Sequence, residues 1–187
     1  GHAQATWPSN AFRIAYNIPL LFWAPEMILP GRTSERFVSS LDLFSTILGY
    51  LDLTEKTELD CVPSRDFSKI LRNETTEWTD EIFIEQEETR AIRTPLWSYS
   101  KRFKESKAYT LEDELYDLRN DPDERMNVAN LEDVGDIQQT LSAKIDEFFA
   151  FYADPLFDIW KGGSVKSNTS RPWLWKDAWG PEWHPVT

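Results

Sequence analysis

The sequence contains a single cysteine and only two histidines among its 187 residues. Cys61 has no second cysteine to pair with, so an intrachain disulfide and a zinc site built from several cysteines are both excluded. These absences do not limit the hydrophobic core, because a domain usually holds about 50–250 residues. The chain is long enough for one large domain, or for a domain joined to a fragment of another.

Long hydrophobic runs are also missing. The longest, Ile18 to Trp23, is closed by Ala24-Pro25-Glu26, far short of the ~20 residues that span a bilayer. We therefore expect no membrane partner. Basic residues are in the minority, with 20 lysines and arginines against 32 acidic residues and a formal net charge of −12. This balance argues against a nucleic-acid partner, because such binding depends on lysine and arginine neutralising phosphates.

The sequence opens on Gly1-His2-Ala3-Gln4 rather than on methionine, without the basic and apolar segments of a signal peptide. We expect an N-terminal portion to precede it. No internal repeat is present, which argues against solenoids and propellers. Changes in composition and in hydrophobic pattern divide the chain into residues 1–73, 74–154 and 155–187.

Residues 1–73 combine one apolar run with one amphipathic pattern. The run 18–23 is typical of a strand buried on both faces of an α/β sheet. After a turn at Pro30-Gly31, Ser39 or Ser40 could cap a helix whose apolar face is Leu41, Phe44, Ile47, Leu48 and Leu51. A strand followed by such a helix predicts the edge of a doubly wound sheet.

Residues 74–154 predict a small α+β subdomain. Four short segments alternate β-favouring residues with polar ones, namely 81–85, 90–93, 97–101 and 114–118. They indicate an antiparallel sheet. One long helix follows, ended by Asp154-Pro155, and its apolar stripe should lie across one face of the sheet: Ile137, Leu141, Ile145, Phe148, Phe149 and Tyr152.

The tail, residues 155–187, is rich in tryptophan. Each of these large side chains could bury roughly 150–250 Å², so we expect the tail to pack on the rest of this polypeptide or, in a homo-oligomer, on a neighbouring subunit. Cations lie among the aromatic residues, including Lys166 and His184. One interpretation is a substrate-binding rim for an anionic or sugar-bearing molecule. The alternative is a docking strap whose lysines stay solvated.

Several segments, in order along the chain, resemble the C-terminal portion of sulfatases of the alkaline-phosphatase superfamily. They are Ile18 to Pro25, Pro30-Gly31, Ser40 to Leu48, Ala91-Ile92-Arg93-Thr94 with Trp97-Ser98-Tyr99, Glu114-Leu115-Tyr116-Asp117-Leu118, Asn120 to Glu124 and Asn127-Val128-Ala129. The strand and turn at 114–122 support a fold rather than chemistry, because Asn120, Asp121 and Pro122 are turn-forming residues.

The resemblance implies a sulfuric ester hydrolase acting on a sulfated small molecule or sugar. In the family a formylglycine attacks the ester, and a calcium ion bound mostly by the N-terminal portion offsets the developing charge. We recognise no catalytic residue and no metal ligand in this chain. The resemblance therefore predicts that this stretch alone is inactive and that a missing N-terminal catalytic portion is its partner.

Two further features touch on chemistry. His2 lies near the position where sulfatases often carry a histidine that contacts the sulfate; the alternative is a histidine at a frayed terminus. The family commonly has a lysine a few residues later, roughly where Pro8 and Ser9 stand in this sequence. Cys61-Val62-Pro63-Ser64-Arg65 matches the Cys-x-Pro-x-Arg pattern for formylglycine formation. In the family, however, that pattern lies far upstream of the strand that resembles 18–23, so we interpret it as a structural link.

Two alternatives remain. The shared scaffold also suits a phosphodiester or phosphonate hydrolase, or a phosphoglycerol transferase, because fold does not fix function. A different class is a non-catalytic module that binds carbohydrate or a partner protein through its tryptophans.

Overall fold

The computed structural model describes residues 11–51, 53, 61–74, 76–105, 111–166 and 171–186. They form two compact units, one from residues 11–16 and 83–186 and the other from residues 17–82. No helix of the described residues is both long and apolar enough to cross a membrane. The predicted boundaries after residues 73 and 154 stay predictions.

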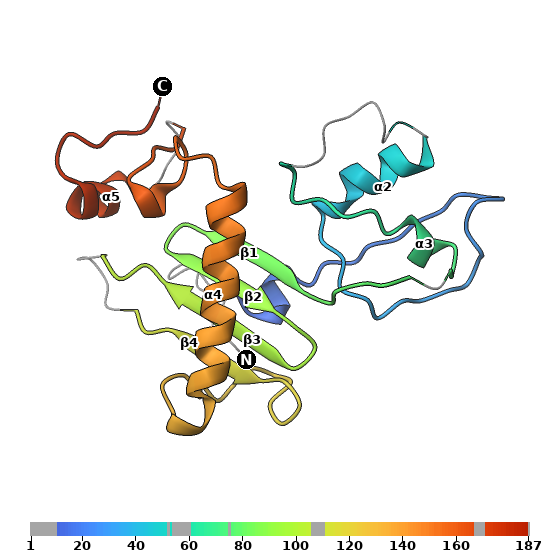
Figure 1. The fold of residues 1–187 in the computed structure, drawn as a ribbon, viewed down its shortest axis with the longest axis horizontal. Coiled ribbons are helices and arrows are strands. Elements are labelled where there is room, and N and C mark those ends of the chain that lie inside the picture. The colour runs from blue at the N-terminus through green and yellow to red at the C-terminus, as the bar shows by residue number, and fades with distance from the viewer. Residues whose placement is uncertain are drawn as a thin grey trace. The chain divides into compact units, whose positions relative to one another are not determined.

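The first unit is built on a four-stranded meander (Figure 1). Its strands are β1 (Ile82–Gln86), β2 (Thr89–Arg93), β3 (Trp97–Arg102) and β4 (Glu114–Asp117), in the spatial order β1-β2-β3-β4. β3 pairs antiparallel with both β2 and β4. The four predicted strand segments and the antiparallel sheet are confirmed.

The strand register brings three apolar residues together on one face. Tyr99 in β3 lies opposite Ile92 in β2 and Leu115 in β4. All three are buried, with 1% or less of their surface exposed. Because side chains alternate between the faces of a strand, this register fixes which face becomes the core.

Helix α4 (Gly135–Tyr152) covers that face of the sheet (Figure 1). Leu141, Ile145 and Phe149 on the helix join the core cluster of the sheet, and full burial of each such side chain is worth about 1.5–3 kcal/mol. The rings of Phe83 and Phe148 stack with centroids 3.9 Å apart. The helix ends before Asp154-Pro155, as the sequence predicts.

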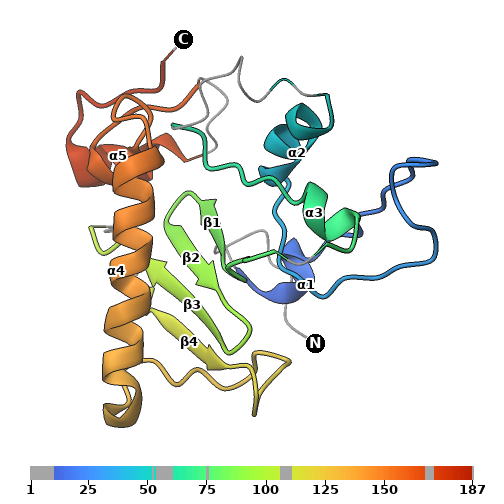
Figure 2. The same cartoon turned by 45° about the vertical axis from the view of Figure 1, so that its right-hand side comes forward.

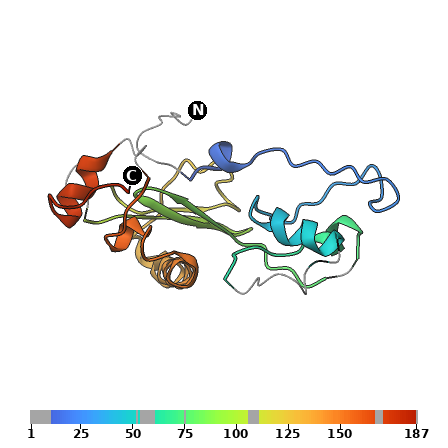
Figure 3. The same cartoon turned by 90° about the horizontal axis from the view of Figure 1, so that it is seen from above.

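The opposite face of the sheet is polar yet largely buried. Helix α1 (Arg13–Tyr16) lies on this side, away from α4 (Figure 3). The Tyr16 hydroxyl donates to Gln86 Oε1 at 2.7 Å. Arg93 in β2 forms an ion pair with the buried carboxylate of Glu124, which also accepts a hydrogen bond from the backbone N–H of Arg13. Hydrogen bonds and ion pairs therefore satisfy these polar groups on this face.

The turn after β4 is held by side chains that bond to backbone. Asp121 Oδ2 accepts hydrogen bonds from the N–H groups of Arg125 and Met126 at 2.7 and 2.8 Å. Asn127 Oδ1 accepts from the N–H of Leu115, and its amide donates to the carbonyl of Asp113. The expected structural role of this strand and turn agrees with these contacts.

The second unit contains α2 (Asp42–Tyr50) and α3 (Ser68–Leu71). The predicted helix is confirmed, but its apolar stripe faces outward: Asp42, Ser45 and Thr46 are buried, whereas Phe44 and Ile47 are about half exposed. Sequence periodicity detected the helix correctly. It could not reveal that the polar side would be buried.

The predicted strand at 18–23 is wrong for this structure. The run has no strand assignment, and Leu21 and Trp23 are 91% and 89% exposed. A strand needs a neighbour to pair its backbone N–H and C=O groups, and no described strand pairs with this run. The fold class is otherwise as expected: a small α+β subdomain with an antiparallel sheet and one long helix.

Candidate functional site

The tryptophan-rich tail forms a second hydrophobic core beside the turn between β1 and β2 (Figure 2). Its regular elements are η3 (Ile159–Lys161) and α5 (Pro172–Trp179), which starts with proline where no backbone donor is needed. Leu174 and Trp175 on α5 are fully buried and pack with Phe103. Of the two alternatives expected for the tail, the structure shows packing on its own polypeptide.

Indole N–H groups fix three tryptophans of the tail. Trp160 Nε1 donates to the carbonyl of Glu87 at 2.6 Å, and Trp179 Nε1 donates to Ile159 at 2.8 Å. Trp183 Nε1 donates to the carbonyl of Gly163 at 2.5 Å. These indoles orient the tail, so their polar atoms are engaged within the fold.

Two acidic residues at the β1–β2 turn hold the start of α5. Arg171 Nη1 lies 2.9 Å from Glu88 Oε1, and Arg171 also forms an ion pair with Glu87. Burial raises the pKa of Glu87, although the nearby Arg171 guanidinium works in the opposite direction. Glu87 and Glu88 therefore supply an anchor for the tail, with Glu88 only 1% exposed.

A second buried pair joins β2 to the start of the tail. Arg90 Nη2 lies 2.7 Å from Asp158 Oδ1, and the guanidinium is over the rings of Phe149 and Trp160, 4.2 and 4.8 Å from their centroids. The partners stand 68 residues apart in the sequence. No local spacing signals such a pair, so sequence reasoning missed it.

Lys166 and His184, predicted to bind substrate, lie on adjacent backbone segments. Lys166 forms an isolated parallel bridge with Val186, and the Ser164 hydroxyl donates to the carbonyl of His184 at 2.8 Å. Both predicted residues are exposed. The structure therefore brings their backbones together at the surface.

The tail carries other exposed cations and aromatic side chains. Lys161 and Lys176 are exposed, as are Trp173 at 51% and Trp179 at 39%. A hollow on the surface lies beside α4, and none of these four side chains lines it. The tail offers cations and aromatic faces on an open surface.

The hollow has a volume of about 630 Å³, and its walls come from α4, the loop before it and the sheet, with polar and apolar surface in about equal parts. The buried Tyr99 hydroxyl donates to Asp113 Oδ2 at 2.7 Å at its edge. Burial raises the pKa of Tyr99, and the bond to Asp113 raises it further. Tyr99 is therefore a neutral hydrogen-bond donor here.

Asp113 is held by three donors from different positions. Its Oδ1 accepts from the N–H of Arg102 at 3.0 Å and lies 2.7 Å from Lys104 Nζ, while Oδ2 accepts from Tyr99. Burial works to raise the pKa of Asp113, but these donors outweigh it and lower the pKa below its usual value. The carboxylate ties β3 to the start of β4.

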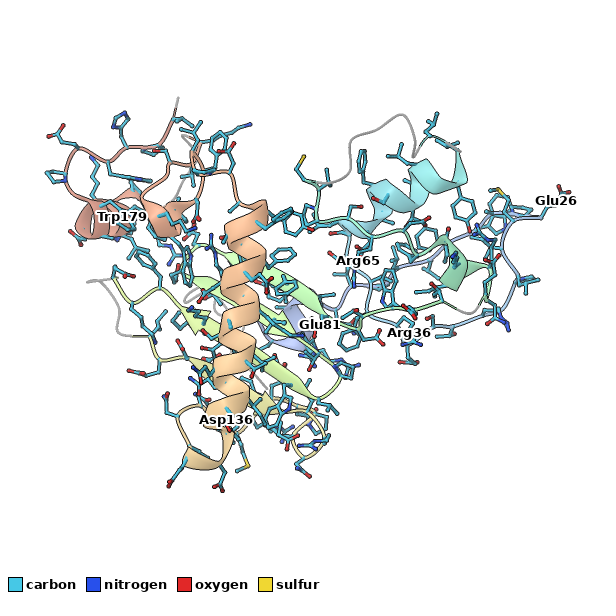
Figure 4. The ribbon with its side chains drawn as sticks, in the orientation of Figure 1. Glu26, Arg36, Arg65, Glu81, Asp136 and Trp179 are labelled. Atoms are coloured by element: carbon cyan, nitrogen blue, oxygen red, sulfur yellow. The ribbon has the colours of Figure 1, made fainter. Side chains whose placement is uncertain are left out.

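The Cys-x-Pro-x-Arg pattern serves the packing of α2. The Arg65 guanidinium donates from Nη2 and Nε to the two oxygens of Asp42, at 2.8 and 3.1 Å, and stacks over Trp78 at 4.2 Å (Figure 4). Ser64 accepts a hydrogen bond from the N–H of Ser45. Cys61 is exposed and free. These contacts support the structural interpretation of the pattern.

His2 lies outside the described residues, so its predicted contact with substrate stays a prediction. Among the residues that the structure does describe, no group of three acidic, histidine or cysteine side chains could hold a metal ion. The calcium expected from the resemblance stays a prediction for the complete enzyme.

Residues 11–150 match the family described as N-sulphoglucosamine sulphohydrolase, C-terminal. The match spans most of the chain, including the sheet, α4 and the Asp42–Arg65 pair. The chain belongs to this sulfatase family. No curated protein matches it.

Solved structures share the fold of this sulfatase chain at 19–24% identity. A candidate sulfatase, yidJ from Bacteroides fragilis, has a TM-score of 0.55 at 19% identity, with 70% of this chain and 29% of that chain covered. BT4656, solved with its substrate D-glucosamine-2-N,6-O-disulfate, has the same TM-score and identity and is covered over 28% of its length, by 70% of this chain.

The phosphonate monoester hydrolase of Agrobacterium radiobacter has a TM-score of 0.50 at 24% identity, with 68% of this chain and 28% of that chain covered. The chain thus spans less than a third of each of these three solved chains. At such identities the likeness shows the fold and leaves the reaction open.

Proposed function

We propose that this chain is the C-terminal portion of a sulfatase that hydrolyses sulfate esters, and that it acts as a scaffold for a catalytic N-terminal portion of the same polypeptide. The observation that carries the proposal is the match of residues 11–150 to the C-terminal family of a sulphohydrolase. Coverage of only 28–29% of similar solved chains agrees with this division.

The buried charges also support a scaffolding role. Hydrolysis of a sulfate ester needs positive groups that face the transferred anion. In this chain the buried guanidinium groups of Arg90 and Arg171 and the partly buried one of Arg93 are already opposed by carboxylates. Those cations stabilise the fold, so we assign the nucleophile and the calcium site to the N-terminal portion.

The proposed substrate is a sulfated sugar or small molecule, and the tail is the part of this chain proposed to contact it. BT4656, whose fold is similar to that of this chain, was solved in complex with a sulfated glucosamine. The exposed Lys166 and His184 stand on neighbouring segments, where a lysine could attract sulfate and an imidazole could donate a hydrogen bond. His2 is proposed to contribute a further hydrogen bond to the sulfate.

Replacement of Lys166 tests this contact. In the complete enzyme, Lys166→Ala should raise KM for a sulfated sugar several-fold while kcat changes little, because the lost attraction acts on substrate binding. Lys69→Ala, which removes an exposed lysine from α3, is the matched control and should leave KM unchanged. Equal kinetics for both variants would remove Lys166 from the substrate site.

The reaction itself is tested by competing ester classes. The complete polypeptide should hydrolyse an aryl sulfate faster than the matching aryl phosphonate monoester. The chain shares its fold with a phosphonate monoester hydrolase, so faster hydrolysis of the phosphonate is the main competing outcome. That outcome would assign phosphonate hydrolysis to the enzyme in place of sulfate hydrolysis. The non-catalytic rival predicts instead that the isolated chain binds sugar and that deletion of residues 155–187 abolishes binding.

A further inference from the structure

The turn between β1 and β2 carries two neighbouring glutamates that share one cation. Arg171, at the start of α5, forms ion pairs with both Glu87 and Glu88. The side chain of Glu88 is 2% exposed and that of Glu87 is 28% exposed. Two carboxylates in one site repel each other, so the binding of one proton by the pair lowers the electrostatic cost of burying it.

The backbone of this turn is fixed between the end of β3 and the tail. Glu87 has a φ of 44°, in the left-handed region that side chains with a Cβ seldom adopt and that costs energy to maintain. Its carbonyl accepts from the indole N–H of Trp160 at 2.6 Å, and the carbonyl of Glu88 accepts from the N–H of Phe103 at 2.9 Å. The turn cannot move away from the tail without the loss of these bonds.

Negative charge is in excess where the turn meets the tail. Arg90 forms ion pairs with both Glu85 and Asp158, so this guanidinium, like the one at the start of α5, faces two carboxylates. On the neighbouring strands Arg102 pairs with Glu114, which leaves the balance unchanged. Carboxylates therefore outnumber guanidinium groups across the described part of this interface, and the cost of this excess falls when one carboxylate is protonated.

We propose that the pair of Glu87 and Glu88 is a pH-sensitive clamp for the tail: it binds one proton as the pH falls below neutral, and the tail then docks more tightly on the β1–β2 turn. Glu87 takes up this proton, because its side chain is the more open to solvent of the two. Burial raises the pKa of Glu87 above its ordinary value of 4.5, Arg171 opposes this rise, and Glu88 adds to it.

The direction of the effect follows from the two states of the tail. In the docked state the pKa of Glu87 is raised, and in the detached state its carboxyl is in water and has its ordinary pKa of 4.5. The docked state therefore binds the proton more tightly. Its advantage is complete below the ordinary value and is lost as the pH rises through the raised one. One proton limits the change in the docking equilibrium to about tenfold for each pH unit.

The clamp has a consequence for the enzyme proposed above, and this consequence alone rests on the proposed function. Lys166 and His184 belong to the tail, and their segments are joined by the bridge to Val186 and by the bond from Ser164. Tighter docking of the tail in mild acid would hold both side chains more firmly. Binding of a sulfated substrate would then strengthen over the same range of pH.

Hydrogen exchange of the α5 amides tests the clamp. In the wild-type chain their protection, corrected for the intrinsic pH dependence of exchange, should rise several-fold from about pH 8 to about pH 5. Glu87→Gln keeps the shape of the side chain but carries no charge. It should be at least as protected as the wild type at about pH 8 and rise little further. Glu88→Gln, which removes the neighbouring carboxylate, should reduce the same pH dependence.

Glu147→Gln is the matched control, because it removes an exposed carboxylate from α4, and it should keep the pH dependence of the wild type. Constant or falling protection of α5 in the wild type towards about pH 5 would overturn the clamp. The full wild-type pH dependence in Glu87→Gln would overturn it as well. Both results are read from α5 alone, so they do not depend on whether the complete enzyme hydrolyses sulfate esters.

Discussion

The carboxylate of Asp42 joins Ser39 and Arg65 to the start of α2 in the second unit. It is 1% exposed and bonds to Arg65 through both oxygens and to the backbone N–H groups of Ser39 and Arg65. Because Arg65 is part of the Cys-x-Pro-x-Arg pattern, the same residues that resemble a modification signal are needed for packing.

Removal of this carboxylate should be costly. We expect Asp42→Ala to lower the free energy of unfolding by about 2–3 kcal/mol, since it removes the ion pair with Arg65 and leaves the N–H groups of Ser39 and Arg65 without their acceptor. Asp146→Ala removes the partner of Lys101 at a site where the aspartate side chain is 62% exposed, and should change stability by less than about 1 kcal/mol. Urea unfolding, monitored by tryptophan fluorescence, measures the stability of both variants. Equal losses of unfolding free energy would contradict the structural role of Asp42.

The lowered pKa of Asp113 predicts a pH dependence. A carboxyl whose pKa is lower in the folded state stabilises the fold above its unfolded pKa of about 3.8, and this contribution is lost as pH falls through the folded value. The stability difference between the wild type and Asp113→Asn should therefore be largest near pH 6 and shrink towards pH 3. A difference that stays constant over this range would rule out the proposed role of the carboxylate.

At the scale of elements, the tail depends on a close backbone approach at Gly163. A Cβ at this position would stand 2.7 Å from the backbone nitrogen of Asp158 and 2.8 Å from the carbonyl oxygen of Leu156. A Cβ on Gly135, at the start of α4, would meet nothing within 4 Å. Its φ of −56° suits alanine. The two glycines thus form a matched pair.

Gly163→Ala should destabilise the protein by about 1–3 kcal/mol, because backbone atoms cannot yield as a flexible side chain would. Gly135→Ala should stabilise it by about 0.5 kcal/mol by lowering the entropy of the unfolded chain. Thermal unfolding compares the two variants, and limited proteolysis should cut Gly163→Ala faster within the tail. A stabilised Gly163→Ala would show that the tail is not packed as described.

Local patterns predicted most of the elements of the first unit. Alternation gave the four strands, and the stripe through Leu141, Ile145 and Phe149 gave α4 with its buried side. The same reasoning failed for the orientation of α2, because the burial of its polar side depends on Arg65, which follows Asp42 by 23 residues. The strand at 18–23 failed because pairing requires neighbours that periodicity cannot reveal.

The candidate site was less predictable than the fold. The tryptophan content predicted that the tail would pack, but not the ion pairs that hold it, since Glu88 and Arg171 are 83 residues apart. Lys166 and His184 were chosen for their residue types, and the structure places them on adjacent backbone segments of the surface. Whether they bind substrate depends on groups that lie outside this chain in the proposed enzyme.

At the scale of the whole molecule, stability and reactivity are assigned to different portions of the polypeptide. The described chain pairs its buried arginines with carboxylates and carries two apolar surfaces on residues 18–23 and α2. Both properties suit a supporting portion of a sulfatase. They do not by themselves supply the attacking group or the charge that sulfate hydrolysis needs.

Sulfate release is the most direct measurement of this division. The purified 187-residue chain and the polypeptide encoded by the complete gene should be incubated with the same aryl sulfate at equal molar concentration. We expect turnover by the complete polypeptide and none by the isolated chain above a blank prepared identically. Turnover by the isolated chain, or a gene that encodes nothing ahead of Gly1, would contradict the account.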